Sequence, residues 1–275
     1  MIPTEAAPLP PSGPDRLFRV GPLRSAGGTT VEASMRCGPW TVGPDGRPGL
    51  GSLCVLLDAV LGQATIAGRP ADMWPVTTEM TVDLTGPVPD DGDVTVRAWV
   101  IASGGRSVVA RGDVLGPGGE LIGVATEWGR LVPEVPEIPP DTGSDLVPPD
   151  GDAATVLGAY VVVDAPTRAA GEERPTLTLP GSPALANERD TMHGGILATV
   201  AELAAVAVLR GTPERPMATG SLHVTYLRPA MMDGPTTVRT TAVHRGRSFG
   251  VIRSDVRNAA GKLAAAATVT RRALD

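Results

Sequence analysis

The sequence predicts an α+β protein made of two copies of one unit, each a curved antiparallel sheet wrapped around one long apolar helix. Two observations predict this fold class. The chain of 275 residues repeats its own landmarks after 141 to 144 positions. Each copy also contains one apolar run that is too long for a strand, followed by segments in which polar and apolar residues alternate.

The landmarks of the repeat occur in the same order in both halves. Gly49 precedes the first apolar run and His193 the second, and 193 − 49 = 144. The strand-like segments that follow end at Pro87 and Pro229, which are 142 positions apart. A period this long indicates duplicated domains rather than a solenoid. Gly-Arg-Ser triplets at 105–107 and 246–248, and glycines at 119 and 261, follow at offsets of 141 and 142.

Composition sets the predicted boundaries. Residues 1–14 are proline-rich and are expected to form a flexible tail. Residues 132–152, VPEVPEIPPDTGSDLVPPDGD, contain six prolines and six acids and therefore predict an extended linker. The two predicted domains are an N-terminal unit over 15–131 and a C-terminal unit over 153–275.

Within each half the same elements are expected in the same order. A strand (29–35 and 176–180) precedes a loop, and the loop leads into the apolar run SLCVLLDAVLG or ILATVAELAAV. Three or so strands follow, as in 222–227, where alternate residues face one way. A helix that is apolar nearly all round has to be covered on most sides, and a strongly curved sheet provides that cover.

Bulk composition excludes several classes of partner. The net charge of −6 argues against nucleic acid or a membrane surface as the main partner. The start of the chain has neither the basic residues nor the apolar core of a signal peptide. The two cysteines, Cys37 and Cys54, are not in a metal-ligand spacing. We therefore expect a reduced, cytoplasmic protein without a metal site.

One acid lies in each apolar run, nine positions after the landmark that precedes the run: Asp58 after Gly49 and Glu202 after His193. Buried carboxylates are rare without a partner or a purpose. Each could be catalytic, or could be a structural hydrogen-bond acceptor between the halves.

Several motifs in the second half resemble the hotdog-fold thioesterases, in particular the phenylacetic-acid-type branch. They are Asn187, the triplet His193-Gly194-Gly195 with its acid nine positions later, Tyr-Leu-Arg-Pro at 226–229 and Gly-Arg-Ser at 246–248. The resemblance covers 176–270 well and 29–130 more weakly, through the repeat. The whole chain is similar to double-hotdog acyl-CoA thioesterases, in which two hotdogs in one polypeptide imitate the usual dimer.

The resemblance implies what the protein acts on. The substrate would be an acyl-CoA or acyl-carrier-protein thioester, hydrolysed to free acid and thiol by water, without a cofactor. It also implies that the pseudo-dimeric chain forms homo-oligomers.

The loop that carries the motif suits the chemistry of a thioester carbonyl. Gly194 and Gly195 lie where a loop becomes a helix, so their N–H groups are expected to be vacant donors for an oxyanion. They could also be no more than a tight turn. Asn187 could hold the attacking water or the thioester oxygen. For His193 we favour a positioning role over acid–base work.

Helix geometry decides which acid serves this loop. Nine residues of helix span about 13 Å and end on the opposite face, so Glu202 cannot reach its own His-Gly-Gly loop. Family members build sites across the dimer interface, which implies that this loop meets Asp58. The facing loop has Gly43 and Gly49 where the second half has asparagine and histidine.

We therefore predict one competent site per chain, with Asp58 as base or nucleophile. By resemblance Thr77 would serve beside Asp58, while Glu202 would be a relic that keeps a structural hydrogen bond.

Two further questions stay open at this stage. Arg228 and Arg247 are candidates to bind the phosphates of coenzyme A, although either could be an ordinary surface arginine. The alternative functions are a non-catalytic acyl-thioester-binding scaffold and, less favoured, an acyl-thioester hydratase or dehydratase, whose usual Asp-x-x-x-x-His pairing we do not find in the sequence.

Overall fold

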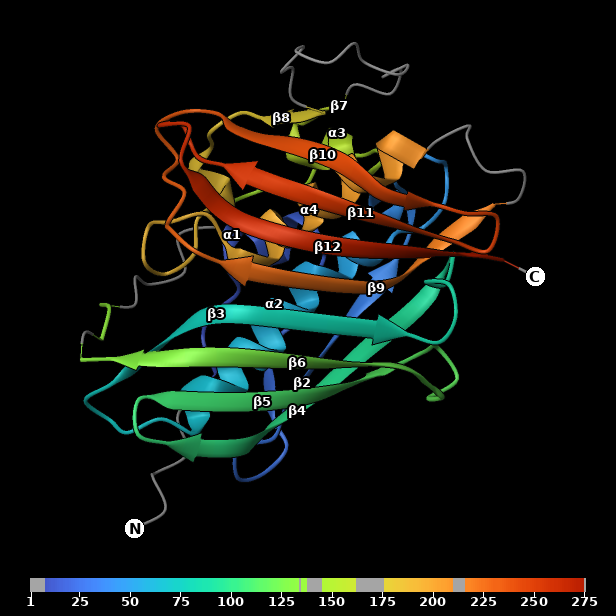
Figure 1. Cartoon of the computed structure of the whole chain (residues 1–275). Coiled ribbons are helices and arrows are strands. Elements are labelled where there is room, and N and C mark those ends of the chain that lie inside the picture. Colours follow the sequence, from blue (N-terminus) through green and yellow to red (C-terminus); the bar gives the residue numbers. More distant parts are fainter. Residues whose placement is uncertain (1–7, 134, 138–144, 162–175, 210–215, 275) are drawn as a thin grey trace.

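A computed structural model of the chain describes residues 8–133, 135–137, 145–161, 176–209 and 216–274. Over these residues it shows one twelve-stranded antiparallel sheet that curves around two long helices (Figure 1). The elements of the first half are α1 (Gly13–Leu17), β1 (Arg24–Ser25), β2 (Val31–Cys37), η1 (Pro39–Thr41), α2 (Leu50–Ala67), β3 (Trp74–Leu84), β4 (Gly92–Gly104), β5 (Ser107–Leu115) and β6 (Leu121–Val132).

The second half repeats this order of elements. Its elements are α3 (Ala153–Leu157), β7 (Tyr160–Val161), β8 (Leu177–Leu179), η2 (Pro183–Leu185), α4 (Gly194–Leu209), β9 (Met217–Tyr226), β10 (Thr236–Arg245), β11 (Phe249–Arg257) and β12 (Leu263–Ala273).

The strand order shows the duplication directly. It reads β1-β2-β4-β5-β6-β3-β9-β12-β11-β10-β8-β7, so each half has the same topology and the two halves meet at β3 and β9. Thr81 of β3 pairs with His223 of β9 at the centre of this seam, and the Thr81 hydroxyl lies 2.8 Å from Nδ1 of His223. The predicted α+β class, with one long apolar helix for each curved half-sheet, is confirmed.

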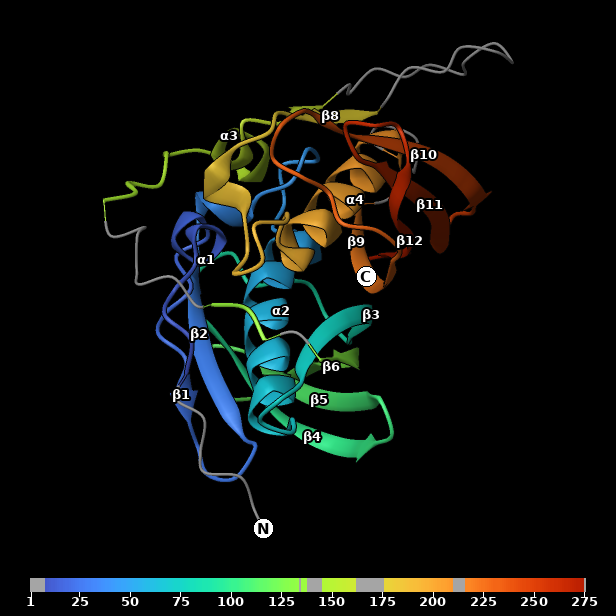
Figure 2. The same ribbon diagram turned by 90° about the vertical axis from the view of Figure 1, so that its left-hand side faces the viewer.

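The two long helices pack against each other in opposite directions (Figure 2). A Cβ atom on Gly195, at the start of α4, would lie 2.6 Å from the Cys54 carbonyl oxygen in the middle of α2. At the other end of the contact, the Thr199 hydroxyl donates to the carbonyl oxygen of Gly51 at 2.7 Å. The start of each helix therefore faces the middle of the other, which brings the acid of one half to the loop of the other half.

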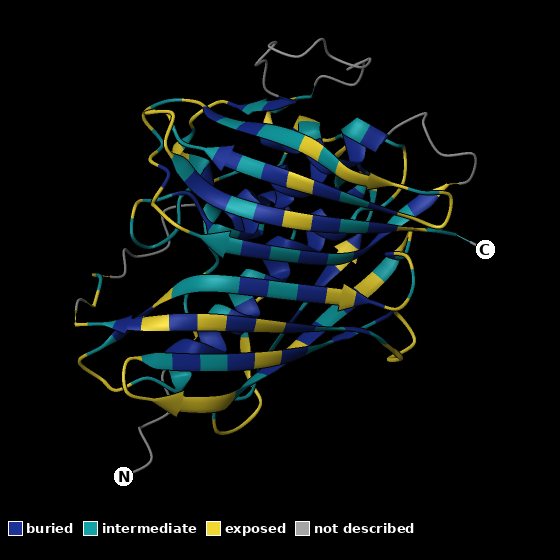
Figure 3. Cartoon of the chain, viewed as in Figure 1, coloured by how far each residue is buried: buried dark blue, intermediate teal, exposed yellow. Residues whose placement is uncertain are grey.

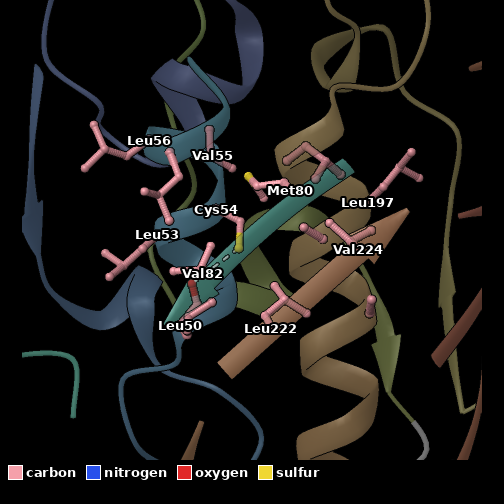
Figure 4. Packing of buried hydrophobic residues seen from close by; sticks show 14 of the residues in the cluster. Leu50, Leu53, Cys54, Val55, Leu56, Met80, Val82, Leu197, Leu222 and Val224 are labelled. Carbon is pink, nitrogen blue, oxygen red and sulfur yellow. Dashed lines mark hydrogen bonds between the residues drawn. The ribbon is translucent and has the colours of Figure 1, made fainter. Parts of the chain in front are cut away.

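The core lies between the helices and the concave face of the sheet. Figure 4 shows Met80 and Val82 of β3 beside Leu222 and Val224 of β9, all fully buried between α2 and α4. Buried and exposed residues alternate along the strands, as Figure 3 shows, because successive side chains point to opposite faces. The alternating segments of the sequence therefore become the walls around two helices that are buried on most sides.

Helix α2 is long and apolar enough to cross a membrane by length and composition. In the described structure, however, 78% of that stretch is buried inside the protein. The apolar side chains of α2 therefore pack inside the protein, as those of a core helix do.

The structure differs from the expected flexible tail over 1–14. Residues 1–7 lie outside the described residues, but the Leu9 N–H donates to the side-chain oxygen of Gln63 on α2 at 3.0 Å. Ser12 and Asp15 then form a capping box that begins α1. Hydrogen bonds therefore hold the backbone in place from residue 9 onward.

The predicted linker 132–152 is described only in part, because 134 and 138–144 lie outside the described residues. Strand β6 ends at Val132, and the N–H of Ala153, the first residue of α3, donates to the Val42 carbonyl oxygen at 3.0 Å. The domain boundaries themselves stay a prediction.

Candidate active site

The loop 187–193 connects η2 to α4 and is fixed by the side chain of Asn187. Its Oδ1 accepts hydrogen bonds from the N–H groups of Arg189 (2.9 Å) and Thr191 (3.2 Å) and from the Thr191 hydroxyl (3.2 Å). Its Nδ2 group donates to none of the described residues. Asn187 therefore holds the loop with its oxygen and leaves its amide N–H groups for a ligand.

Asp58 of α2 lies against the start of α4. Its Oδ2 is 3.1 Å from Nδ1 of His193, and the N–H groups of Gly194 and Gly195 are directed at its carboxylate. A Cβ atom on Gly194 would lie 2.7 Å from Oδ1 of Asp58, so glycine is needed for this approach. The cross-half juxtaposition that the sequence led us to expect is present.

One part of the expected geometry differs. We expected the N–H groups of Gly194 and Gly195 to be vacant, whereas both face Asp58, and the Gly195 N–H also donates to Nδ1 of His193 at 3.1 Å. They lie at the N-terminus of α4, where four N–H groups have no partner within the helix. Side chains from the two halves fill that role.

Burial raises the pKa of Asp58 above its ordinary value of 3.8, while His193 and the two glycine N–H groups favour its charged form and oppose the rise. Nδ1 of His193, 3.1 Å from Oδ2 of Asp58, also lies 3.1 Å from the Gly195 nitrogen, so the three groups form one buried cluster at the start of α4.

Thr77 does not serve Asp58 as predicted. Its hydroxyl donates instead to Oε1 of Glu127 at 3.1 Å. Glu127 on β6 is 1% exposed, and its Oε2 has no hydrogen-bond partner among the described residues. Burial, and then the charge of Asp58, raise the pKa of Glu127 well above its ordinary value of 4.5. Thr77 and Glu127 form a pair next to Asp58.

Sequence reasoning missed three residues of this site. Glu127 occupies an inward-facing position of an alternating strand, and a charge at such a position was the available signal. Glu188 follows Asn187, and burial raises its pKa. The Tyr226 hydroxyl donates to the Gly194 carbonyl oxygen at 3.0 Å. For Glu188 no pattern in the sequence gave a signal, and Tyr226 served only as part of a motif.

A cavity of about 1330 Å³ opens at Asp58 between the two halves. We call the part of the cavity that α2 lines beyond Asp58 one arm, and the part that the loop 187–193 and the segment after β9 line the other arm. The residues that line it include Leu9, Pro10, Asp58, Gly62, Ile66, Trp74, Thr77, Asn187, Glu188, His193, Gly194, Tyr226, Arg228 and Met232.

The pseudo-symmetric position around Glu202 is closed. Glu202 is fully buried and accepts a hydrogen bond from the Thr219 hydroxyl at 2.6 Å. A Cβ atom on Gly51 would lie 2.9 Å from its Oε2, so Glu202 faces the first-half loop as Asp58 faces the second. Beside it, Arg271 forms an ion pair with Asp45 at 2.6 Å. None of these four side chains lines the cavity.

The two predicted phosphate-binding arginines are far apart. Arg228 lines the cavity, and its Nη1 donates to the Leu263 carbonyl oxygen at 2.9 Å. Arg247 lies in the turn between β10 and β11, at the opposite end of the sheet, and does not line the cavity. The length of β9 separates the two ends by roughly 30 Å. Of these two arginines, only Arg228 lines the cavity.

The described residues contain no group of three or more His, Cys, Asp or Glu side chains that could hold a metal ion. The expectation that the protein works without a metal or cofactor stays a prediction.

Comparison with known proteins is consistent with this geometry. Residues 190–265 match the family model described as the thioesterase superfamily. None of the curated protein sequences matches the chain. The matched region begins in the loop that carries His193 and runs into β12.

Solved structures share the fold over nearly the whole chain. A candidate thioesterase from Novosphingobium aromaticivorans is 17% identical, with a TM-score of 0.63 over 92% of this chain and 98% of its own. An acyl-CoA thioesterase II from Mycobacterium marinum is 12% identical, with a TM-score of 0.60 over 95% and 96%. An acyl-ACP thioesterase from Bacteroides thetaiotaomicron is 12% identical, with a TM-score of 0.58 over 89% and 98%.

At these identities the structural likeness establishes the fold alone. The protein has the hotdog fold, and its residues 190–265 are similar to the thioesterase superfamily.

Proposed function

We propose that the protein hydrolyses an acyl-CoA thioester to the free acid and free coenzyme A, at one site formed across its two halves. The observation that carries the proposal is the contact of Asp58, from the first half, with His193 and Gly194 of the second, at the mouth of both cavity arms. The thioesterase-superfamily match over 190–265 supports the reaction class.

In this mechanism Asp58 acts as the base. It removes a proton from a water molecule, whose oxygen forms a bond to the thioester carbonyl carbon, and the carbonyl π electrons move to oxygen. When that oxyanion collapses, the carbon–sulfur bond breaks and the proton on Asp58 passes to the thiolate. The products are a carboxylic acid and a thiol, and water is the only co-reactant.

The start of α4 supplies the stabilisation of the oxyanion. As Asp58 takes up the proton, its charge disappears while charge develops on the substrate oxygen. The Gly194 N–H, which is fixed at the start of α4, then donates to the oxyanion beside Asp58, with the helix dipole favouring the negative charge. The Asn187 amide supplies a further donor, because its Oδ1 already holds the loop. His193 keeps Asp58 oriented.

Coenzyme A is the proposed thiol, and Arg228 lines the cavity with a cationic group suited to its phosphates, although the phosphate of a carrier protein's phosphopantetheine arm would fit the same group. Cys37 and Cys54 are both free and buried, which supports a reducing, cytoplasmic location. Assembly of the chain into homo-oligomers stays a prediction.

The test is a panel of acyl-CoAs with measurement of free thiol. Replacing Asp58 with asparagine keeps the shape of the site and removes the base, so we expect kcat to fall about a hundredfold to ten-thousandfold. Glu202→Gln is the matched control in the closed position, and we expect nearly unchanged turnover.

Three results would contradict the proposal. Binding without thiol release, measured by calorimetry, would indicate a scaffold. Loss of enoyl absorbance without thiol would indicate a hydratase. A large loss with Glu202→Gln and none with Asp58→Asn would reverse the assignment of the two sites.

A further inference from the structure

One arm of the cavity runs along a single face of α2 beyond Asp58. Asp58, Gly62 and Ile66 are spaced by four residues, so they lie one above the other on the helix, and all three line the cavity. A Cβ atom on Gly62 would meet nothing within 4 Å. The arm is therefore open beside the helix at Gly62.

One wall of this arm is formed by residues 9–15, which we call the N-terminal strap. Leu9, Pro10 and Pro11 line the cavity next to α2. The hydrogen bond from the Leu9 N–H ends on Gln63, whose side chain is only 2% exposed, so the strap is anchored to a buried group of the same helix. The strap therefore forms part of the cavity wall, although its proline-rich sequence is typical of a flexible tail.

The other end of the strap is fixed against the second half. Ser12 and Asp15 bond each other in the capping box of α1. A Cβ atom on Gly13 would clash with the carbonyl oxygen of Ala184 next to η2, so only glycine allows this contact. The strap therefore crosses from one half to the other with both of its ends held.

The chemistry of the arm is apolar at its far end. Ile66 and Trp74 are 7% and 2% exposed, and Leu23 lies beside them in the lining. The other arm carries polar and charged groups such as Asn187, Glu188 and Arg228. A hydrocarbon chain fits the first arm, and a polar carrier fits the second.

From this geometry we infer that the acyl chain of the substrate lies along α2 between Gly62 and the strap, and that Gly62 and Leu9 set its maximum length. The inference rests on the proposed thioester hydrolysis for the position of the reacting carbonyl at Asp58. The eight residues from Asp58 to Ile66 rise about 12 Å, so the substrate class is a straight aliphatic acyl thioester of about that length.

The first test fills the arm. Gly62→Leu places a side chain in the open space, and we expect kcat/KM for long acyl-CoAs, relative to short ones, to fall about tenfold for each methylene excluded. Gly104→Leu is the control, because its Cβ also meets nothing within 4 Å but lies on β4 outside the cavity. We expect an unchanged length profile for the control.

The second test changes the size of the side chain at Leu9 in the strap. Leu9→Ala opens the arm, so we expect the longest acyl chain accepted to increase, and Leu9→Trp should shorten it. An unchanged profile in the Gly62 and Leu9 variants, with hydrolysis intact, would overturn the acyl arm and leave the proposed function standing. Melting temperatures show that each variant is folded.

A failure of hydrolysis is separable from a failure of the inference. If the wild type releases no thiol from any acyl-CoA, the same variants are compared by calorimetry with straight-chain fatty acids as probes. A length limit that shifts with Gly62→Leu would support the arm although the proposed function had failed. Fatty acids that bind with no length limit, or not at all, would overturn the arm.

Discussion

Asp58, Glu127 and Glu202 are all carboxylates whose pKa is raised by burial, yet their neighbours differ. Asp58 has a histidine and two glycine N–H groups beside an open cavity. Glu202 has the Thr219 hydroxyl and the charge of Arg271, and it does not line that cavity. A buried carboxylate is therefore available for chemistry at Asp58, whereas at Glu202 it packs and accepts hydrogen bonds.

The pH dependence of turnover should report Asp58. The base has to be anionic, and burial raises its pKa above 3.8, so we expect kcat/KM to fall on the acid side at a pH above that value. A pH–rate profile with a non-ionising substrate measures this limb. A rate that stays flat down to about pH 4 would show that Asp58 keeps an ordinary pKa or is not the base.

Glu127 should make stability depend on pH. Its pKa is raised in the folded chain, so its contribution is fully present below the ordinary value of 4.5 and is lost as the pH rises through the folded pKa. In Glu127→Gln this loss is absent, so we expect the variant to gain stability over the wild type as the pH is raised.

Urea unfolding of both proteins at about pH 5 and about pH 8 measures this difference. Because the charge of Asp58 acts on Glu127, the difference between the two proteins reports Glu127 together with its coupling to Asp58. Equal slopes would mean that Glu127 is ionised as easily as in the unfolded chain.

At the scale of elements, the crossing of α2 and α4 depends on small residues at their closest approach. A Cβ atom on Gly195 would lie 2.6 Å from both the Cys54 oxygen and the Val55 Cα, and backbone atoms cannot move aside cheaply. We expect Gly195→Ala to lower the free energy of unfolding by about 2 kcal/mol, and chemical denaturation measures it.

Gly62→Ala is the matched control for this prediction, because it also replaces a glycine inside a long helix. Its Cβ would meet nothing within 4 Å, so we expect a gain of up to about 1 kcal/mol from helix propensity. If both substitutions stabilised the protein, the close crossing would not hold in solution.

At the scale of the whole molecule, the halves form one sheet and bury two acids at two related places, and of these two acids Asp58 lines the described cavity and Glu202 does not. A difference in residue at one equivalent strand pairing explains the asymmetry. Thr77 pairs with Gly129, whereas the equivalent Thr219 pairs with Arg271. The arginine side chain extends to Asp45 of the other half and closes the space.

Replacing Arg271 should lower the free energy of unfolding without lowering the turnover. The side chains of Arg271 and Asp45 are 5% and 17% exposed, so Arg271→Met leaves a mostly buried aspartate without its partner. We expect a loss of about 3 kcal/mol in the free energy of unfolding, at the low end for a buried pair because Asp45 keeps some solvent.

Turnover of the Arg271→Met variant should stay at the wild-type level, since neither residue lines the cavity. Asp45→Asn combined with Arg271→Met should recover part of the lost stability, because the unpaired charge is gone. A fall in kcat at unchanged stability would show that the Glu202 position takes part in the reaction.

Much of the site could be predicted, because it follows from the spacing of motifs along the sequence. The nine-residue interval, the paired glycines and the internal repeat together led to the contact of Asp58 with His193 and Gly194. Glu127 could not be found in the same way, since its proximity to Asp58 depends on strand register. Arg247 was misplaced because a motif gives no information about which end of a sheet it reaches.

The sequence by itself determined the duplicated α+β architecture, the two long core helices and the acid that belongs to each. It did so because hydrophobic periodicity and repeat spacing are local properties of the chain. Only the tertiary structure decided that residues 9–15 form a wall, that Thr77 serves Glu127, and that Arg271 closes one of two related sites. Those outcomes depend on which side chains from distant segments share a space, and no local pattern records that.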